Sequence, residues 1–232
     1  MLPTFVCIGA QKTGTSWLYS QLLQHPQVFL PTVKELNFFH RELPQSWYAR
    51  HFDRAASEQA RGDISPNYMV LPGVAGRMHA LLPAARLICI VREPVARAKS
   101  QYPMAVKLGN LPADMPFMEA FRRNLQYLQE RGCYLELLQR FTHHYSRGDS
   151  LQVFLYDDLV ADAGSFFRRI CAHIGVDADF KPTGLTQRVA AGGAGLQLSD
   201  AEEAELRSFY APHIDALERY LGRSLQAWRQ TP

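Results

Sequence analysis

The sequence lacks the features that mark membrane-spanning, secreted or metal-binding proteins. No apolar run approaches the roughly 20 residues of a membrane-spanning helix, and the first predicted strand lies too near Met1 to leave room for a signal peptide. The four cysteines are far apart, without a Cys-X-X-Cys pair, so we expect reduced thiols in the core. These absences predict a soluble cytoplasmic protein. A catalytic domain excised from a larger protein would share them.

A large excess of positive or negative charge is also missing. The formal net charge of +3 gives little support to nucleic acid binding, although it is compatible with an anionic cofactor or substrate. The 232 residues, 47% of them hydrophobic, suit one globular domain over residues 1–232. Nothing in the sequence indicates the oligomeric state.

What the sequence does contain is a short apolar run at residues 5–8, a turn holding Gly9 and Gly14, and an amphipathic segment after it. This order predicts a strand, a phosphate-binding loop and a helix whose first N–H groups face an anion. In a nucleoside-triphosphate loop a lysine follows the second glycine, but here Thr15 has that position and Lys12 lies inside the loop, while Ser16 keeps the hydroxyl. The loop therefore favours a phosphate-type ligand other than a triphosphate held with magnesium.

A short predicted strand at residues 62–65 and apolar runs at residues 86–91 and 151–156 alternate with helical patterns. This alternation predicts a three-layer α/β fold of the P-loop type, with a central parallel sheet flanked by helices. Residues 103–118 resemble a loop or broken helix over the site. A capping box at Ser199 predicts a helix to about Tyr210, and another helix is expected after Pro212.

Arg92 follows the buried run 86–91, at the strand end where open α/β sheets usually bind ligands. A guanidinium can bind a phosphate through two hydrogen bonds, and Ser100 on the next helix could donate another. A solvated basic helix face, including Arg97 and Lys99, is the alternative interpretation.

These motifs together resemble the sulfotransferases that use 3′-phosphoadenosine 5′-phosphosulfate (PAPS), and they are most similar to the heparan sulfate branch, in a soluble form of bacterial type. The resemblance extends over nearly the whole chain, with each motif in the right order. The motifs are residues 11–16, Arg92 with Ser100, Lys34-Glu35 followed by Phe38-Phe39, residues 65–68, and residues 209–212 with Trp228.

The resemblance implies a role for each matched position. Glu35 would be the general base and Lys12 would contact the region between phosphate and sulfate, with Lys34 adding positive charge there or orienting the acceptor. Arg92 and Ser100 would bind the 3′-phosphate. The 5′-phosphosulfate loop would consist of Gln11, Lys12, Thr13, Gly14, Thr15 and Ser16. The chemistry requires an in-line acceptor, a base and a cation near the leaving oxygen, and it requires no metal.

Two departures from the family pattern concern the cofactor lid and the acceptor. A Lys-Gly-Arg type loop that closes over the cofactor is replaced by residues 186–195, in which Arg188 is a candidate substitute. Asn37 stands where many enzymes of the heparan sulfate branch have a histidine. Sugar hydroxyls and other small-molecule alcohols therefore both remain possible acceptors.

Two other functions are open at this stage. A magnesium-dependent nucleotide kinase would use Asp157 or Asp158 as the carboxylate next to the metal, and a non-catalytic nucleotide-binding protein would keep the fold without turnover. Trp17, Phe38, Trp47 and Tyr68 favour a working acceptor site, although each alone is more typical of core packing. His143 and His144 are adjacent on a predicted helix without further ligands at suitable spacing, so we expect a solvent-facing pair.

Overall fold

The computed structural model describes residues 1–56, 59–186 and 196–229. The chain forms two compact units. The first comprises Met1–Val91 with Arg140–Ala190, and the second comprises Arg92–Gln139 with Ala191–Pro232. Each unit is described by itself.

The first unit is built around a five-stranded sheet in which every pairing is parallel. The strand order is β2-β3-β1-β4-β5, so β1 lies in the centre between β3 and β4. The apolar runs that begin at residues 5, 86 and 151 form β1, β4 and β5, as expected for a sheet covered on both faces. Their bounds are Phe5–Gly9 for β1, Val28–Phe29 for β2, Ala60–Ile64 for β3, Arg86–Val91 for β4 and Leu151–Leu155 for β5.

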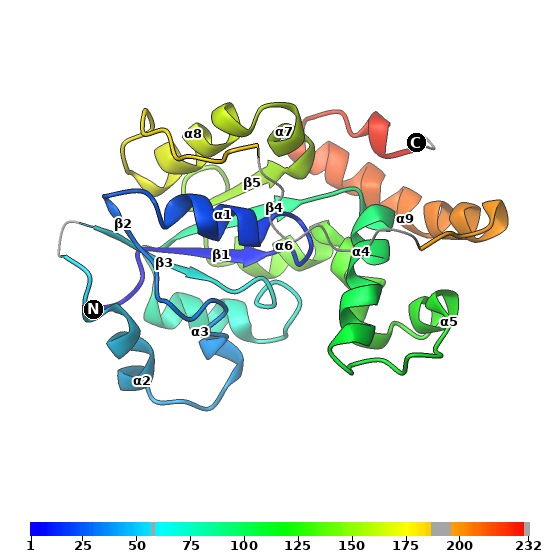
Figure 1. The fold of residues 1–232 in the computed structure, drawn as a ribbon, viewed down its shortest axis with the longest axis horizontal. Coiled ribbons are helices and arrows are strands. Elements are labelled where there is room, and N and C mark those ends of the chain that lie inside the picture. Colours follow the sequence, from blue (N-terminus) through cyan, green and yellow to red (C-terminus); the bar gives the residue numbers. More distant parts are fainter. Residues whose placement is uncertain (57–58, 187–195, 230–232) are drawn as a thin grey trace. The chain divides into compact units, whose positions relative to one another are not determined.

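Helices cover both faces of this sheet (Figure 1). Trp17 of α1 (Thr15–Leu22) and Phe166 of α8 (Ala163–Ile174) pack in one core cluster with Phe5 and Cys7 of β1. The crossover from β3 to β4 runs in the opposite direction to the one that leaves β1, so right-handed connections place α3 (Val74–Leu81) on the other face. The expected three-layer α/β fold is confirmed.

The second unit is helical. It holds α4 (Pro94–Lys107), α5 (Phe117–Arg122) and α9 (Asp200–Leu221), and α6 (Tyr134–Thr142) begins in it. The remaining short elements of the chain are α2 (Gln45–Ala49), α7 (Tyr156–Ala161) and the 3₁₀ turns Phe38–His40, Arg50–Phe52, Leu125–Tyr127, Glu130–Gly132 and Gln226–Arg229.

The capping box at Ser199 is confirmed, but the expected break before Pro212 is wrong because α9 continues through it. The buried residues Leu206, Tyr210, Ile214 and Leu217 form one apolar stripe across the proline, and burial of this stripe offsets the missing backbone hydrogen bond. Pro103 is likewise inside α4, so the expected loop over residues 103–118 begins only after Lys107.

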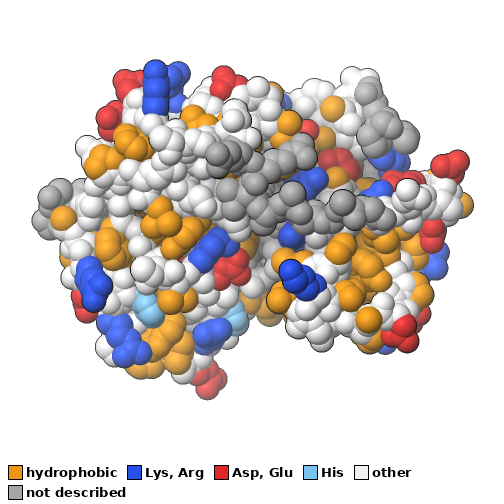
Figure 2. All heavy atoms as spheres, viewed as in Figure 1, with side chains coloured by type: hydrophobic (Ala, Val, Ile, Leu, Met, Phe, Trp, Pro, Cys, Tyr) orange, Lys and Arg blue, Asp and Glu red, His pale blue; other side chains and the backbone are white. Residues whose placement is uncertain are grey.

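The surface agrees with the mild net charge. On the face shown in Figure 2, lysine and arginine side chains are scattered among acidic and apolar ones. Within the described part of the chain, no helix combines the length and apolar character needed to cross a membrane. The four cysteines are buried free thiols, as predicted.

Candidate functional site

The loop after β1 is shaped by two residues in left-handed backbone conformation, Lys12 (φ 71°) and Gly14 (φ 93°). The Thr13 hydroxyl closes the loop on itself by donating to the carbonyl of Ala10 at 2.7 Å, and the Ala10 N–H donates to the carbonyl of Ile90 at 2.7 Å. Thr13 is fully buried. The loop is therefore attached to the carboxyl ends of β1 and β4.

The start of α1 is available to an anion. Gly14 is the N-cap residue, and in the described chain neither a side-chain cap nor an acidic residue in the first turn neutralises this helix end. Gln11, Lys12 and Ser16 are partly exposed, whereas Thr15 is buried. Backbone N–H groups and the helix dipole can therefore bind a phosphate here, with Lys12 and the Ser16 hydroxyl at hand.

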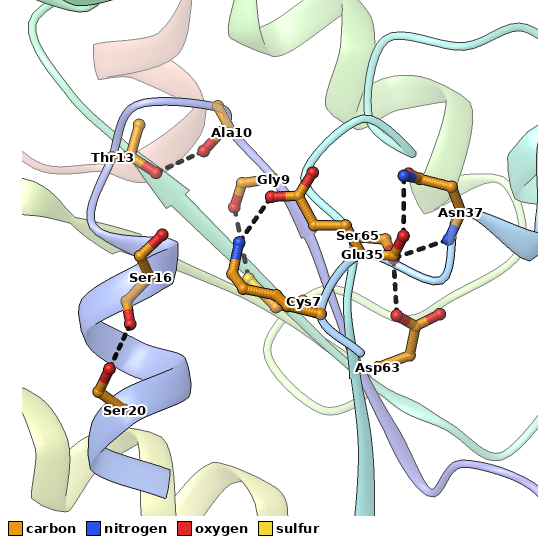
Figure 3. A network of polar contacts seen from close by, with 11 residues as sticks. Cys7, Gly9, Ala10, Thr13, Ser16, Ser20, Glu35, Asn37, Asp63 and Ser65 are labelled. Atoms are coloured by element: carbon orange, nitrogen blue, oxygen red, sulfur yellow. Dashed lines mark hydrogen bonds and ion pairs between the residues drawn. The ribbon is translucent and has the colours of Figure 1, made fainter. Parts of the chain in front are cut away.

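Lys34 and Glu35 form an ion pair in a loop of the same unit, with 2.6 Å between Lys34 Nζ and Glu35 Oε1. Both side chains are partly exposed, at 21% and 34%. The charges of both side chains act on the Cys7 thiol of β1. Figure 3 shows Glu35 with the labelled residues of the β1 loop.

The Cys7 thiol is fully buried in β1. Burial raises its pKa to about 12, with a smaller raising effect from Glu35 and an opposing one from Lys34. A thiol with this pKa stays protonated and is a poor nucleophile at neutral pH.

A buried carboxylate, Asp63 at the end of β3, was not anticipated from the sequence. It accepts hydrogen bonds from the hydroxyls of Tyr48 (2.8 Å), Ser65 (2.7 Å) and Tyr68 (2.8 Å). Burial raises the pKa of Asp63, and the three hydroxyl donors oppose that shift. The available signal was a charged residue inside a predicted buried strand, followed by Ser65 and Tyr68 in the next loop.

The aromatic residues proposed to face an acceptor mostly pack in the interior. Trp17 and Tyr68 are buried, and Phe38 stacks on Tyr48 with 4.3 Å between ring centroids. Trp47 is half-buried and lies parallel to Phe38. Tyr68 and Trp47 contact the loop that carries Glu35, whereas Trp17 packs on Phe166 and Phe167 of α8.

In the second unit, the backbone of Arg92 is held by Tyr134. The Arg92 N–H donates to the Tyr134 hydroxyl at 3.3 Å, and that hydroxyl donates to the Arg92 carbonyl at 2.7 Å. Glu93 caps α4 by accepting from the N–H groups of Val95 and Ala96 at 2.8 and 2.6 Å. Arg92 and Ser100, both partly exposed, are thus attached to a well-anchored helix start.

The alternative of a solvated basic face on α4 is wrong for Arg97, which is fully buried. Its guanidinium donates to Gln101 Oε1 and to the carbonyl of Leu128, each at 2.6 Å. Lys99 forms an ion pair with Glu203 of α9. Both residues therefore have structural partners within the unit.

Arg188 lies outside the described residues, so its predicted contact with the cofactor stays a prediction. The described segment before it is attached to α1, because the Trp17 indole N–H donates to the carbonyl of Leu185 at 2.9 Å.

The residues that favoured other functions are placed as follows. Asp158 forms a 2.7 Å ion pair with Arg169, and Asp157 is exposed in the first turn of α7. His143 and His144 are both exposed, as expected, and His144 stacks on His79. In the described ranges no three His, Cys, Asp or Glu residues form a group suited to a metal ion.

The chain is similar to proteins of one known family. The sequence profile described as "Sulfotransferase family" matches residues 64–180. The chain is 35% identical over 111 residues to the membrane-associated sulfotransferase kil1 of Dictyostelium discoideum, a match over 46% of this chain and 24% of that protein.

It is also 30% identical over 186 residues to mouse heparan sulfate glucosamine 3-O-sulfotransferase 3B1, a match over 75% of this chain and 46% of that protein. The chain thus spans less than half the length of these curated relatives.

The chain also superposes on solved structures of sulfotransferases. A sulfotransferase from Alicyclobacillus acidocaldarius superposes with a TM-score of 0.85 and 28% identity, covering 99% of this chain and 100% of the other. Mouse SULT7A1 complexed with PAP superposes with a TM-score of 0.61, covering 95% of this chain and 88% of the other, and at 16% identity it shows similarity of fold alone.

Proposed function

Because this chain belongs to the sulfotransferase family, we propose that it transfers a sulfuryl group from PAPS to an acceptor hydroxyl. The observation that carries the proposal is an anion-binding helix start in the same unit as the Lys34-Glu35 pair. The first can bind a phosphosulfate, and the second offers a carboxylate that can accept a proton. We propose that residues 1–232 act as a single sulfotransferase domain.

The loop after β1 fits the 5′ end of such a donor. Gly14 has a left-handed backbone, and a side chain there would have its Cβ 3.0 Å from Leu159. PAPS, when bound, supplies the sulfuryl group and a phosphate leaving group. We assign the 5′-phosphosulfate contacts to Gln11, Lys12, Thr13, Gly14, Thr15 and Ser16.

The catalytic roles follow from charge. Lys12 stabilises the negative charge that develops on the leaving oxygen, and Glu35 accepts the proton of the acceptor hydroxyl. Lys34 orients the Glu35 carboxylate through their 2.6 Å contact. No metal is assigned a role in these steps.

We assign the 3′-phosphate to Arg92 and Ser100, with Arg188 as a further contact. A partly exposed guanidinium on an anchored backbone suits this role, because it can bind two phosphate oxygens at once. The acceptor is a sugar or another small-molecule or glycan alcohol. The heparan sulfate enzymes among the relatives make a carbohydrate the first class to examine.

The first test is calorimetric binding of 3′-phosphoadenosine 5′-phosphate (PAP) beside ATP with magnesium. We expect tight PAP binding, weak ATP binding, and loss of PAP binding in Arg92→Ala. Arg123→Ala is the matched control, since Arg123 is exposed and pairs only with Glu119 in its own helical turn among the described contacts. Preference for magnesium ATP would instead indicate a kinase.

The second test is turnover with labelled PAPS and a panel of carbohydrate and other alcohol acceptors. Removal of a general base usually costs about 100-fold to 10,000-fold in rate, and we expect a loss in this range for Glu35→Gln with PAP affinity retained. PAP binding without turnover of any acceptor would favour a non-catalytic nucleotide-binding protein. An unchanged rate in Glu35→Gln would remove Glu35 from the mechanism.

A further inference from the structure

The Asp63 carboxylate is 1% exposed and is surrounded by three hydroxyl donors from two parts of the first unit, α2 and the loop after β3. Oδ1 accepts from Ser65, and Oδ2 accepts from both Tyr48 and Tyr68. A carboxylate without a proton can accept all three bonds, whereas each hydroxyl has a single hydrogen to give.

Two of these hydroxyls also hold the loop that carries Glu35. The Asn37 N–H donates to Ser65 Oγ at 3.2 Å, and the Phe38 N–H donates to the Tyr68 hydroxyl at 2.8 Å. Because the hydrogens of Ser65 and Tyr68 are directed to Asp63, their lone pairs face the backbone N–H groups of the loop. Figure 3 shows the Asn37, Ser65 and Asp63 part of this chain of contacts.

The loop needs such support because its backbone is unusual. Glu35 (φ 63°) and Asn37 (φ 52°) both have left-handed conformation, which is costly for residues with a side chain. The Asn37 side-chain amide donates to the Glu35 carbonyl at 2.9 Å and links the two residues. The first backbone group anchored by the network is thus two residues from the proposed base.

We propose that Asp63 is a positioning residue for sulfuryl transfer, which acts through Ser65 and Tyr68 to fix the backbone that presents the Glu35 carboxylate. This inference rests on the proposed function of Glu35. It predicts that damage to the network lowers kcat while the affinity for PAP, which we assign to other residues, is kept.

Tyr48 provides a matched control. Its hydroxyl donates to the same Asp63 oxygen as that of Tyr68, with the same 2.8 Å distance, but among the described contacts only the Tyr68 hydroxyl accepts from the backbone of the loop. Tyr48→Phe and Tyr68→Phe each remove one bond to Asp63 and keep the ring. Only Tyr68→Phe leaves the Phe38 N–H without its acceptor.

The experiment compares kcat and acceptor KM for Asp63→Asn, Tyr68→Phe and Tyr48→Phe, with PAP binding by calorimetry. Disturbance of both loop anchors predicts about a 10-fold to 100-fold lower kcat for Asp63→Asn, and loss of the acceptor of the buried Phe38 N–H predicts about a 10-fold lower kcat for Tyr68→Phe. Tyr48→Phe should stay within about 3-fold of wild type, and PAP affinity should be unchanged in all three.

A double-mutant cycle separates positioning from general destabilisation. If Asp63 acts through Glu35, then Asp63→Asn should change the residual rate of Glu35→Gln by less than about 3-fold. A full, additive loss in that background would overturn the proposal, as would equal effects of Tyr48→Phe and Tyr68→Phe.

A readout without turnover covers the case in which Asp63→Asn folds poorly. Amide hydrogen exchange at Asn37 and Phe38 should be faster in Tyr68→Phe than in wild type or Tyr48→Phe. Unchanged exchange in Tyr68→Phe would refute the positioning role. Failure of the wild-type chain to bind PAP or to use PAPS would refute the proposed function instead, so the two failures are distinguishable.

Discussion

The backbone at Glu35 should store energy that can be measured by comparing Glu35→Gly with Glu35→Ala. Both variants lose the carboxylate and its ion pair with Lys34, so those losses cancel in the comparison. What remains is the left-handed conformation at φ 63°, which alanine must keep and glycine adopts without steric cost.

The expected difference follows from two opposing terms. A left-handed residue with a Cβ costs about 1–2 kcal/mol, and glycine loses about 0.4–1 kcal/mol through the greater freedom of the unfolded chain. Glu35→Gly should therefore be more stable than Glu35→Ala by about 1 kcal/mol, which corresponds to about 2–4 °C in Tm for a chain of this size.

The assay is urea and thermal unfolding of both variants at one pH, followed by turnover with PAPS. Both should be inactive, because neither has a group that accepts the proton. If Glu35→Ala is instead more stable than Glu35→Gly by about 0.4–1 kcal/mol, only the glycine term acts, so the backbone at this position stores no strain and the support assigned to the Asp63 network has nothing to offset.

Other perturbations test the loop, the second unit and the buried carboxylate. Gly14→Ala should weaken PAP binding about 10-fold, because the new side chain strains a left-handed backbone and contacts the core of the first unit. Gly148→Ala is the control, since Gly148 is also left-handed (φ 87°) but has open space around its Cβ. This variant should be less stable and keep the PAP affinity measured by calorimetry. Arg97→Met should lower the free energy of unfolding, measured in urea, by about 2 kcal/mol because buried acceptors lose their donor. Lys99→Met should lower it by less than about 1 kcal/mol because this variant breaks a partly exposed ion pair. Equal losses would contradict a structural role for the buried Arg97 guanidinium. Burial raises the pKa of Asp63 above 3.8, so the folded chain binds the Asp63 proton more tightly than the unfolded chain does. The contribution of protonated Asp63 to stability is therefore largest below pH 3.8, and it is lost as the pH rises through the pKa of the folded chain. Urea unfolding across this range should therefore show a decline that Asp63→Asn lacks, and an equal slope in both proteins would assign the decline to other groups. The groups that act on Asp63 are Ser65, Tyr68, Tyr48 and Glu35.

The sequence predicted the parts of this fold that are encoded locally. Continuous apolar runs gave the strands Arg86–Val91 and Leu151–Leu155, and the glycine-containing turn gave the loop before α1. The helix α7, which follows β5 without a break, was missed because its first turn was interpreted as the end of a strand. The passage of α9 through Pro212 depends on packing that becomes apparent only in three dimensions.

The roles assigned to the candidate site residues stay predictions. Lys12, Glu35 and Arg92 are recognisable from short motifs, and the structure places the first two in one unit. Asp63 was missed because its function depends on hydroxyls that come from separate segments. A single buried acid in a strand gives no indication of the partners that satisfy it until Tyr48 is brought beside it.

The central position of β1 also has a consequence for how this chain acquires its structure. β1 is the first strand in the chain, yet it pairs with β3 on one side and β4 on the other, and β4 must in turn pair with β5. During synthesis β1 therefore emerges long before its partners β3 and β4. The sheet is complete only after β5, which ends at Leu155, has also been made. Such non-local parallel pairing folds slowly, so the apolar segment of β1 is exposed during translation, and protection by a chaperone would be most useful in that interval.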